Sequence, residues 1–142
     1  MAIIQTQCTS FKVELMQALH DFTTGTGNTF KIALYTSFAN LDASTTVYTT
    51  AGEVVGTNYV AGGATLANIT PASSGTTAYV SFDPVTFTNV SIVVSGALIY
   101  NSTNGNRAVA ALDFGSDITK VGQNFVITFP LASATDAILR IA

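Results

Sequence analysis

The sequence predicts an all-β protein, an antiparallel β-sandwich preceded by one N-terminal helix. Segments rich in β-branched and aromatic residues recur along the chain, and glycine, asparagine and proline clusters separate them roughly every 8–12 residues. Only one segment, near the start, has the helical spacing of apolar residues. A chain of 142 residues is long enough for one well-formed core. We therefore expect a single β-sandwich domain over residues 1–142.

The central element is predicted to be a β-hairpin. Residues 91–100 and 107–114 are apolar and rich in strand-forming types, and the polar cluster 101–106 separates them. Within that cluster, Asn104 and Gly105 tolerate the positive φ angles of a tight reversal. Because both faces of the two segments are apolar, we expect this hairpin to lie in the middle of the fold, covered on two sides.

The chain is expected to begin with an arm over residues 1–9, followed by a helix over about 11–22. Thr9 or Ser10 is suited to cap the helix, since a side-chain oxygen there accepts a hydrogen bond from a free backbone N–H. The predicted apolar stripe consists of Phe11, Leu15, Met16, Leu19 and Phe22. The predicted polar side consists of Lys12, Glu14 and Asp21.

Two readings stay open for the apolar start of the arm. Residues 2–4 are suited to add a strand to the sheet edge of a neighbouring molecule. They are equally suited to be a disordered terminus.

The segments between the helix and the hairpin alternate between strand and loop. Residues 30–35 show a period of two, which predicts a strand with one face buried. Residues 37–63 are polar and glycine-rich, which predicts loops with strand fragments at 46–49 and 53–55. Leu66 anchors a segment over 64–69. Further strands are expected at 78–82, 85–87, 125–129 and 137–141, a bulge at 89–91, and loops at 71–75 and 116–124.

Charge is the unusual quantity in the composition. Only 9% of the residues are charged, and 48% are hydrophobic, with a formal net charge of −3. A charged fraction of roughly a quarter is ordinary for a domain in solution. So few charges give little repulsion between molecules, which favours a protein whose surface is occupied by neighbours in an assembly.

Several partners and compartments are excluded by the same numbers. Five basic residues and a pI near 4.7 provide no basic stripe for nucleic acid. No apolar run approaches the roughly 20 residues needed to span a bilayer, so no membrane is expected. The first residues lack a basic segment followed by an apolar one, so no secretory signal is expected. One cysteine excludes an internal disulfide framework.

Residues with chemical potential are few. His20 is the only histidine, and it has no nucleophile or carboxylate partner in the sequence pattern. We expect it to lie partly exposed near the C-terminal end of the helix, where an imidazole complements the helix dipole. Cys8 precedes the helix, where a thiolate can be stabilised, but a small buried hydrophobic residue is the favoured interpretation.

The remaining motifs are weak. Asp113 and Asp117 flank Gly115 and suggest a cation site or an acid–base pair, but a calcium loop would be denser in ligands. A turn-capping role for Asp117, and pairing of Asp113 with Arg107 or Lys120, are the structural alternatives. Gly25-Thr-Gly27 lacks the preceding strand and third glycine of a dinucleotide-binding motif.

The tyrosines offer a further possibility. Flat aromatic side chains stack on sugars, yet strand tyrosines more often pack inside with a hydrogen-bonded hydroxyl. The five are Tyr35, Tyr48, Tyr59, Tyr79 and Tyr100.

Four segments resemble the sequences of a family of small virion proteins of tailed bacteriophages. They are 30–37 (FKIALYTS), 53–63 (EVVGTNYVAGG), 96–101 (GALIYN) and 106–115 (NRAVAALDFG). The resemblance covers nearly the whole chain from the helix onward, and its segments carry no catalytic residues. It implies a β-sandwich of the jelly-roll type on the phage particle. The role it implies is capsid cement or decoration, in which oligomers clamp neighbouring major capsid subunits.

We therefore expect a non-enzymatic structural protein of the virion, made in the host cytoplasm, with no catalytic, metal-binding or cofactor-binding residues. Its expected partners are the major capsid protein and further copies of itself, in a dimer or a trimer. The alternative is a tail or head fibre, or a receptor-binding module whose β-sandwich recognises carbohydrate.

Overall fold

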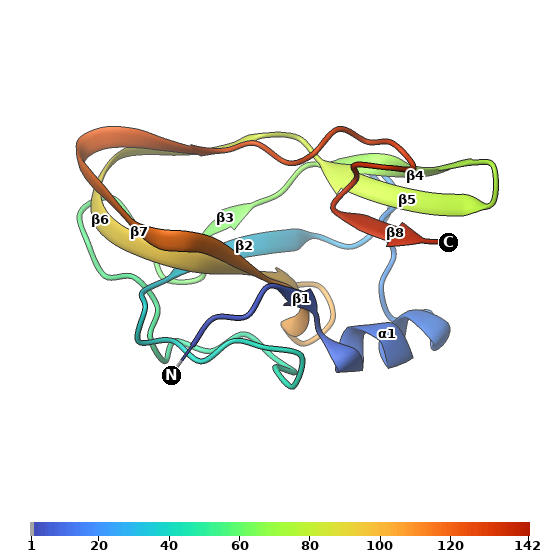
Figure 1. The fold of residues 1–142 in the computed structure, drawn as a ribbon, viewed down its shortest axis with the longest axis horizontal. Helices are drawn as coiled ribbons and strands as arrows, with labels where there is room; N and C mark the ends of the chain where they lie inside the picture. Colours follow the sequence, from blue (N-terminus) through green and yellow to red (C-terminus); the bar gives the residue numbers. More distant parts are fainter. Residues whose placement is uncertain (1) are drawn as a thin grey trace.

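The computed structural model describes residues 2–142 and confirms an all-β antiparallel sandwich with one N-terminal helix (Figure 1). The helix is α1 (Thr9–Met16). The strands are β1 (Thr6–Gln7), β2 (Phe30–Tyr35), β3 (Ala64–Thr65), β4 (Asn68–Ser74), β5 (Thr77–Phe82), β6 (Val85–Asn101), β7 (Arg107–Ile127) and β8 (Leu139–Ile141). One sheet has the order β1-β7-β6-β2-β3, and the other has the order β4-β5-β8. Consecutive strands pair as hairpins (β2–β3, β4–β5, β6–β7), whereas a jelly roll is built from two Greek keys.

The predicted central hairpin is confirmed as β6 and β7. Its pairing runs from Val85 opposite Ile127 to Asn101 opposite Arg107. The turn between the strands has positive φ at Gly105 (65°) and Asn106 (56°), one residue later than the sequence suggested. On the large sheet, β6 lies between β7 and β2, so the hairpin occupies the middle of the fold as expected.

The hairpin is much longer than predicted, because the expected loop at 116–124 is part of β7. The pairing register shifts between Val94 and Gly96, opposite a segment of β7 in which Gly115 has a φ of 86°. A bulge with glycine in this left-handed region bends a strand without ending it. Turn-like composition at 115–122 therefore marks a bend in a continuous strand.

This bend places the hairpin in both layers of the sandwich. Figure 1 shows β6 and β7 rising at the left end of the molecule and returning above themselves towards β5. The interior between the two halves contains aromatic contacts of Phe87 with Phe125 and of Phe114 with Phe125, with ring centroids 6.3 and 5.9 Å apart. The predicted bulge at 89–91 is also present, with Asn89 at a φ of 52°.

The prediction of one exposed face for β2 is wrong. All of its residues are buried except Lys31, which is half-buried. The polar excursion over 37–63 packs against this strand: on one face the Tyr35 hydroxyl donates to Thr49 O at 2.5 Å, and at the edge Val54 N donates to Leu34 O at 2.9 Å. The expected strand fragments in this excursion form only isolated bridges, Val47 with Arg107 and Glu53 with Tyr35.

The predicted loop at 71–75 largely belongs to the edge strand β4. Pro71 lies within the register shift between Ile69 and Ala72, where its missing N–H breaks no regular pairing. An edge strand tolerates proline, so its presence did not end the strand.

The helix is shorter than the predicted 11–22, because the chain reverses at Ala18. The φ of Ala18 is 60°, Leu19 N donates to Glu14 O at 3.0 Å, and Ala18 N donates to Leu15 O at 3.2 Å. These two hydrogen bonds form a Schellman motif, which closes a helix. Neither predicted cap is used, since the N-cap residue is Cys8 and has no side-chain capping bond.

Phe22, the last member of the predicted apolar stripe, lies outside the helix but still reaches the core. Phe22 is buried and stacks on Phe30, with ring centroids 4.3 Å apart and planes 4° apart. Phe11 is buried on the helix itself, but Met16 is 83% exposed. Glu14, which was placed on the polar side, is buried instead. The helical spacing was therefore a correct sign of burial for Phe11 and Phe22, and a wrong sign of burial for Met16 and of the helix length.

The N-terminal arm is paired within its own chain; Met1 lies outside the described residues. Ile4 N donates to Leu41 O, and Leu41 N donates to Ala2 O, at 2.8 and 3.0 Å. β1 then pairs with the outer edge of β7. This arm is therefore neither a strand free to pair with a neighbouring molecule nor a disordered terminus. Residues 2–4 bond to Leu41, and β1 bonds to β7.

A comparison of two glycines tests how tightly the large sheet is built. Gly63 (φ 80°) precedes β3, and a Cβ placed there would lie 1.8 Å from Ile32 O. Gly115 (φ 86°) has no atom within 4 Å of such a Cβ. Gly115→Ala should cost about 1 kcal/mol through backbone strain alone. Gly63→Ala should cost about 3 kcal/mol or more, because the backbone of β2 must also move. Urea unfolding measures both free energies, and equal losses would contradict the close approach.

Candidate functional site

An apolar groove of about 720 Å³ opens between α1 and the small sheet. The segment after the helix supplies its floor through Phe22 and His20. Its rim carries the charged residues Lys12, Asp21 and Arg140. The apolar walls include Phe11, Leu15 and Met16 of α1, Val80 of β5, and Leu139 and Ile141 of β8. Because its walls are mainly apolar with a few charged groups at the rim, we treat this groove as the candidate binding site.

A buried polar cluster lies beneath this groove. The Glu14 carboxylate contacts His20 Nε2 at 3.0 Å through one oxygen and Arg107 Nη1 at 2.8 Å through the other. His20 Nδ1 lies 3.1 Å from the side-chain nitrogen of Asn101. Asn101 is fully buried, and its side-chain oxygen accepts hydrogen bonds from Thr103 N and Asn104 N in the central turn.

These contacts assign the protons of the cluster. Because the Asn101 oxygen is occupied by two backbone donors, its nitrogen faces the imidazole and must donate to His20 Nδ1. His20 Nε2 then carries the proton and donates to Glu14. Both imidazole nitrogens are therefore used within the fold, which leaves neither directed towards a ligand.

The expected position of His20 is thus wrong. Its side chain has no exposed surface and lies outside the helix, four residues beyond Met16. It ties the end of the helix segment to the central turn through Asn101. The sequence offered no sign of this, because Asn101 meets His20, and Arg107 meets Glu14, only through contacts across more than 80 residues.

A second polar cluster surrounds Glu53 on the other side of the large sheet. Its carboxylate is buried and accepts hydrogen bonds from Tyr48 OH (2.7 Å), Tyr59 OH (2.6 Å) and Gly62 N (2.8 Å). Tyr100 OH donates to Gly62 O at 2.6 Å. No cation lies within 4 Å of this carboxylate in residues 2–142. The negative charge is therefore held by oriented O–H and N–H dipoles.

The same cluster determines the acid–base behaviour of its tyrosines. Burial is the main cause that raises the pKa of each hydroxyl above its usual value, and the Glu53 carboxylate raises it further. The affected residues are Tyr35, Tyr48, Tyr59 and Tyr100. Ionising any of them would place a second negative charge beside Glu53, so all four hydroxyls keep their protons at neutral pH.

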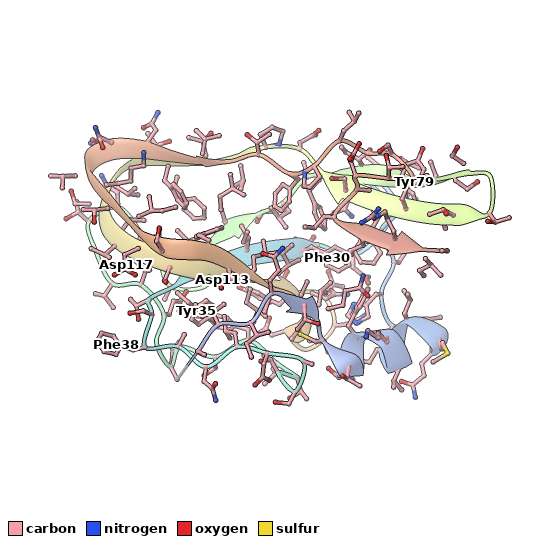
Figure 2. All side chains as sticks on the ribbon, in the orientation of Figure 1. Phe30, Tyr35, Phe38, Tyr79, Asp113 and Asp117 are labelled. Atoms are coloured by element: carbon pink, nitrogen blue, oxygen red, sulfur yellow. The ribbon has the colours of Figure 1, made fainter. Side chains whose placement is uncertain are left out.

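The tyrosines do not form the sugar-binding face that the sequence allowed. Tyr35 and Tyr100 are buried, and Tyr48 stacks on Tyr100 with ring centroids 4.7 Å apart. Figure 2 shows Tyr35 and Tyr79 in different parts of the molecule, with Tyr79 on β5. The alternative reading, packed tyrosines with hydrogen-bonded hydroxyls, describes all four residues of the Glu53 cluster.

Cys8 is the small buried residue that was favoured. It has no exposed surface, and its Sγ lies 3.9 Å from Asp42 O. Burial, followed by the nearby carboxylates of Asp42 and Glu14, raises the pKa of the thiol from 9.0 to about 11. The thiol therefore stays protonated, in contrast to an activated cysteine.

Asp113 and Asp117 lie exposed on β7 near its bend (Figure 2). Asp113 Oδ1 accepts a hydrogen bond from Gly115 N at 2.9 Å and supports the bulge. The predicted pairing of Asp113 with Arg107 is wrong, since Arg107 pairs with Glu14, and Lys120 forms no ion pair in residues 2–142. Within that range, no three acidic, histidine or cysteine side chains gather closely enough to hold a metal ion.

Large apolar side chains are exposed over much of the remaining surface. Val55 is 95% exposed, and Phe38 projects from the lower left of the molecule (Figure 2). The others are Ile4, Val13, Met16, Val47, Val60, Val93, Val121, Val126, Leu131 and Ile141. Over residues 2–142, no helix has the length and apolar character that a bilayer crossing requires.

Comparisons with protein-family models, with curated proteins and with solved structures find no match to this chain.

From the contacts of Glu53 we predict how much stability is lost when its charge is removed. In Glu53→Gln the amide nitrogen cannot accept a hydrogen bond, so at least one buried donor loses its partner. We expect a loss of about 2–3 kcal/mol in the free energy of unfolding. Asp83→Asn, at an exposed carboxylate, is the matched control and should change stability by less than about 0.5 kcal/mol. Equal effects in urea unfolding would refute the buried cluster.

The burial of Cys8 predicts slow chemistry and a pH-dependent stability. At pH 8 Ellman's reagent should react with Cys8 only after urea unfolding, whereas a thiol introduced by Thr26→Cys in a Cys8→Ala background should react at once. The thiol pKa is raised on folding, so its contribution to stability is complete below pH 9 and is lost as the pH rises through 11. Cys8→Ala removes this part of the decline. Fast native labelling of Cys8 would contradict its burial.

Proposed function

We propose that this chain is a non-enzymatic structural protein of a phage virion, a capsid cement or decoration protein that binds neighbouring major capsid subunits and stabilises the head. In this proposal it acts as a homo-oligomer, a dimer or a trimer, on the assembled particle. The observation that carries the proposal is the surface, which combines very few charges with many exposed apolar side chains.

The exposed apolar residues supply the binding energy in this proposal. Fully burying a valine, leucine or phenylalanine side chain contributes about 1.5–3 kcal/mol. Phe38, Val55 and Val60 all lie on the excursion and are at least 71% exposed, so an interface gains most of that amount from each. A lone protein in solution would gain nothing from such residues, and they would promote aggregation.

The internal use of polar groups supports the same proposal. Glu14 and His20 bond to each other, Arg107 bonds to Glu14, and Glu53 is enclosed by tyrosines. These buried groups hold loops and turns in place, and their hydrogen-bonding groups are occupied within the fold. The groups best placed to meet a partner are consequently apolar, which suits permanent contact with a shell.

The mechanism is thermodynamic linkage. A protein that binds the assembled lattice, and not the separate subunits, stabilises the lattice by the free energy of that binding. Contact by several copies at subunit boundaries adds this free energy at every boundary. No covalent chemistry is needed.

The test compares phage particles with and without this protein. Particles that lack it should release their DNA at a lower temperature, and adding the purified protein should restore the original temperature. Because the proposed contacts are apolar, retention on the particle should persist in about 1 M salt, which screens charge pairs beyond about 3 Å.

Two results would count against the proposal. Unchanged disruption temperatures would remove the stabilising role. Saturable binding of the isolated protein to host cells, without binding to heads, would assign it to the fibre or receptor-binding alternative.

A further inference from the structure

We propose that the groove between α1 and the small sheet binds an extended segment of a different protein, which adds a strand to β8, inserts alternate apolar side chains into the groove and carries acidic residues at its ends. The identity of that protein as another virion component rests on the proposed function; the mode of binding does not.

The small sheet turns a partly covered apolar face towards the groove. Ala78 pairs with Ile141 and Val80 pairs with Leu139, so these four side chains lie on the same side of the sheet. All four line the groove. Val80 and Leu139 are buried, but Ile141 is 59% exposed. The inner face of the sheet is therefore only partly covered by its own chain.

The opposite wall is also only partly covered. α1 packs against β7 of the large sheet, and it presents Leu15 and Met16 to the groove. Leu15 is half-buried, and Met16 is 83% exposed. Apolar side chains thus face the groove from both a helix and a sheet, with room between them for further apolar side chains.

The free edge of β8 favours binding of an extended polypeptide segment. β8 is the last strand in the order β4-β5-β8, so in residues 2–142 one side of its backbone has no neighbouring strand. Such an edge offers backbone N–H and C=O groups to an added strand, and alternate side chains of that strand then point into the groove. A helix or a compact apolar molecule would fill the groove but leave this edge unsatisfied.

The charged residues at the rim favour acidic residues at the two ends of the bound segment. Lys12 lines the helical wall of the groove and Arg140 lies at its sheet edge, and in the described chain neither has a carboxylate within 4 Å. Arg140 alternates with Leu139 and Ile141, so its side chain leaves the other face of β8, where its guanidinium donates to Thr135 O. Asp21 is the one carboxylate in the lining, and its Oδ1 already accepts a hydrogen bond from Thr23 N. Two of the five basic residues of an acidic protein therefore lie at one groove, which favours a segment with acidic residues.

A second copy of this chain fits less well. Antiparallel pairing of two β8 strands centred on Arg140 would place two like charges directly opposite each other. The other extended segment, the N-terminal arm, has no acidic residue over 1–9, and its backbone already bonds to Leu41 and β7. The occupant is accordingly another protein.

The test uses the full chain and a short capped peptide with isoleucine at alternate positions, threonine between them and aspartate at both ends. Calorimetry should show binding, and methyl NMR should place it at Met16 and Ile141. A peptide with lysine in place of aspartate should bind about tenfold more weakly. A peptide with N-methylated backbone amides at alternate positions should not bind.

The charge contribution has its own matched variants. The double variant Lys12→Glu, Arg140→Glu should prefer the lysine-ended peptide, whereas Lys120→Glu on β7 should keep the preference of the unaltered chain. Both changes alter exposed or half-exposed side chains, and unfolding curves identify any loss of fold.

Four outcomes overturn the inference. They are no binding of the aspartate-ended peptide, equal binding of both charged peptides, unchanged affinity after N-methylation, and occupation of the groove by a second copy of this chain, detected as a dimer that Met16→Lys dissociates. A failed particle-stability experiment leaves these peptide results intact, so the failure of the proposed function is distinguishable from the failure of this inference.

Discussion

The bend in the β6–β7 hairpin is the constraint on which the rest of the structure depends. Two strands that run through both layers fix how the layers face each other, because a single bulged region around Gly115 joins them. Two further strands of the large sheet add to the edges that this hairpin provides: β2 to β6, and β1 to β7. The small sheet leads directly into the hairpin, because β5 is joined to β6 by Asp83–Pro84 alone. Its inner face is only partly covered and forms one wall of the groove.

Two buried carboxylates hold the irregular segments against this framework. Glu14 connects the helix to Arg107 at the start of β7. Glu53 joins separate parts of the long excursion and orients Tyr59, whose hydroxyl oxygen accepts a hydrogen bond from Leu34 N of β2. A chain with eight acidic residues places two of them inside, at sites where hydrogen bonds offset the cost of removing a charge from water. The exterior is left with still fewer charges than the composition implies.

Much of this arrangement was predictable from local patterns. The hairpin with its turn at 101–106, the strand at 30–35 and the end of one strand at 82 before the next at 85 were confirmed, because alternation and turn chemistry act over a few residues. The errors share a cause. A glycine-rich segment such as 115–122 looks the same whether it ends a strand or bends one, and the distinction depends on the register of the opposite strand. Helical spacing through Phe22 likewise reported burial, while the Schellman motif at Ala18 ended the helix.

By itself, the sequence determined the fold class, the central hairpin and a surface poor in charge, because composition and short-range periodicity are properties of the chain alone. Only the tertiary structure decided that His20 is enclosed between Glu14 and Asn101, that Glu53 lies within a group of tyrosines, and that α1 and β8 leave an apolar groove between them. Each of these depends on residues from different strands and loops meeting in space. The partners of a buried polar group, and the cover over an apolar face, are fixed by packing at long range, which no local pattern encodes.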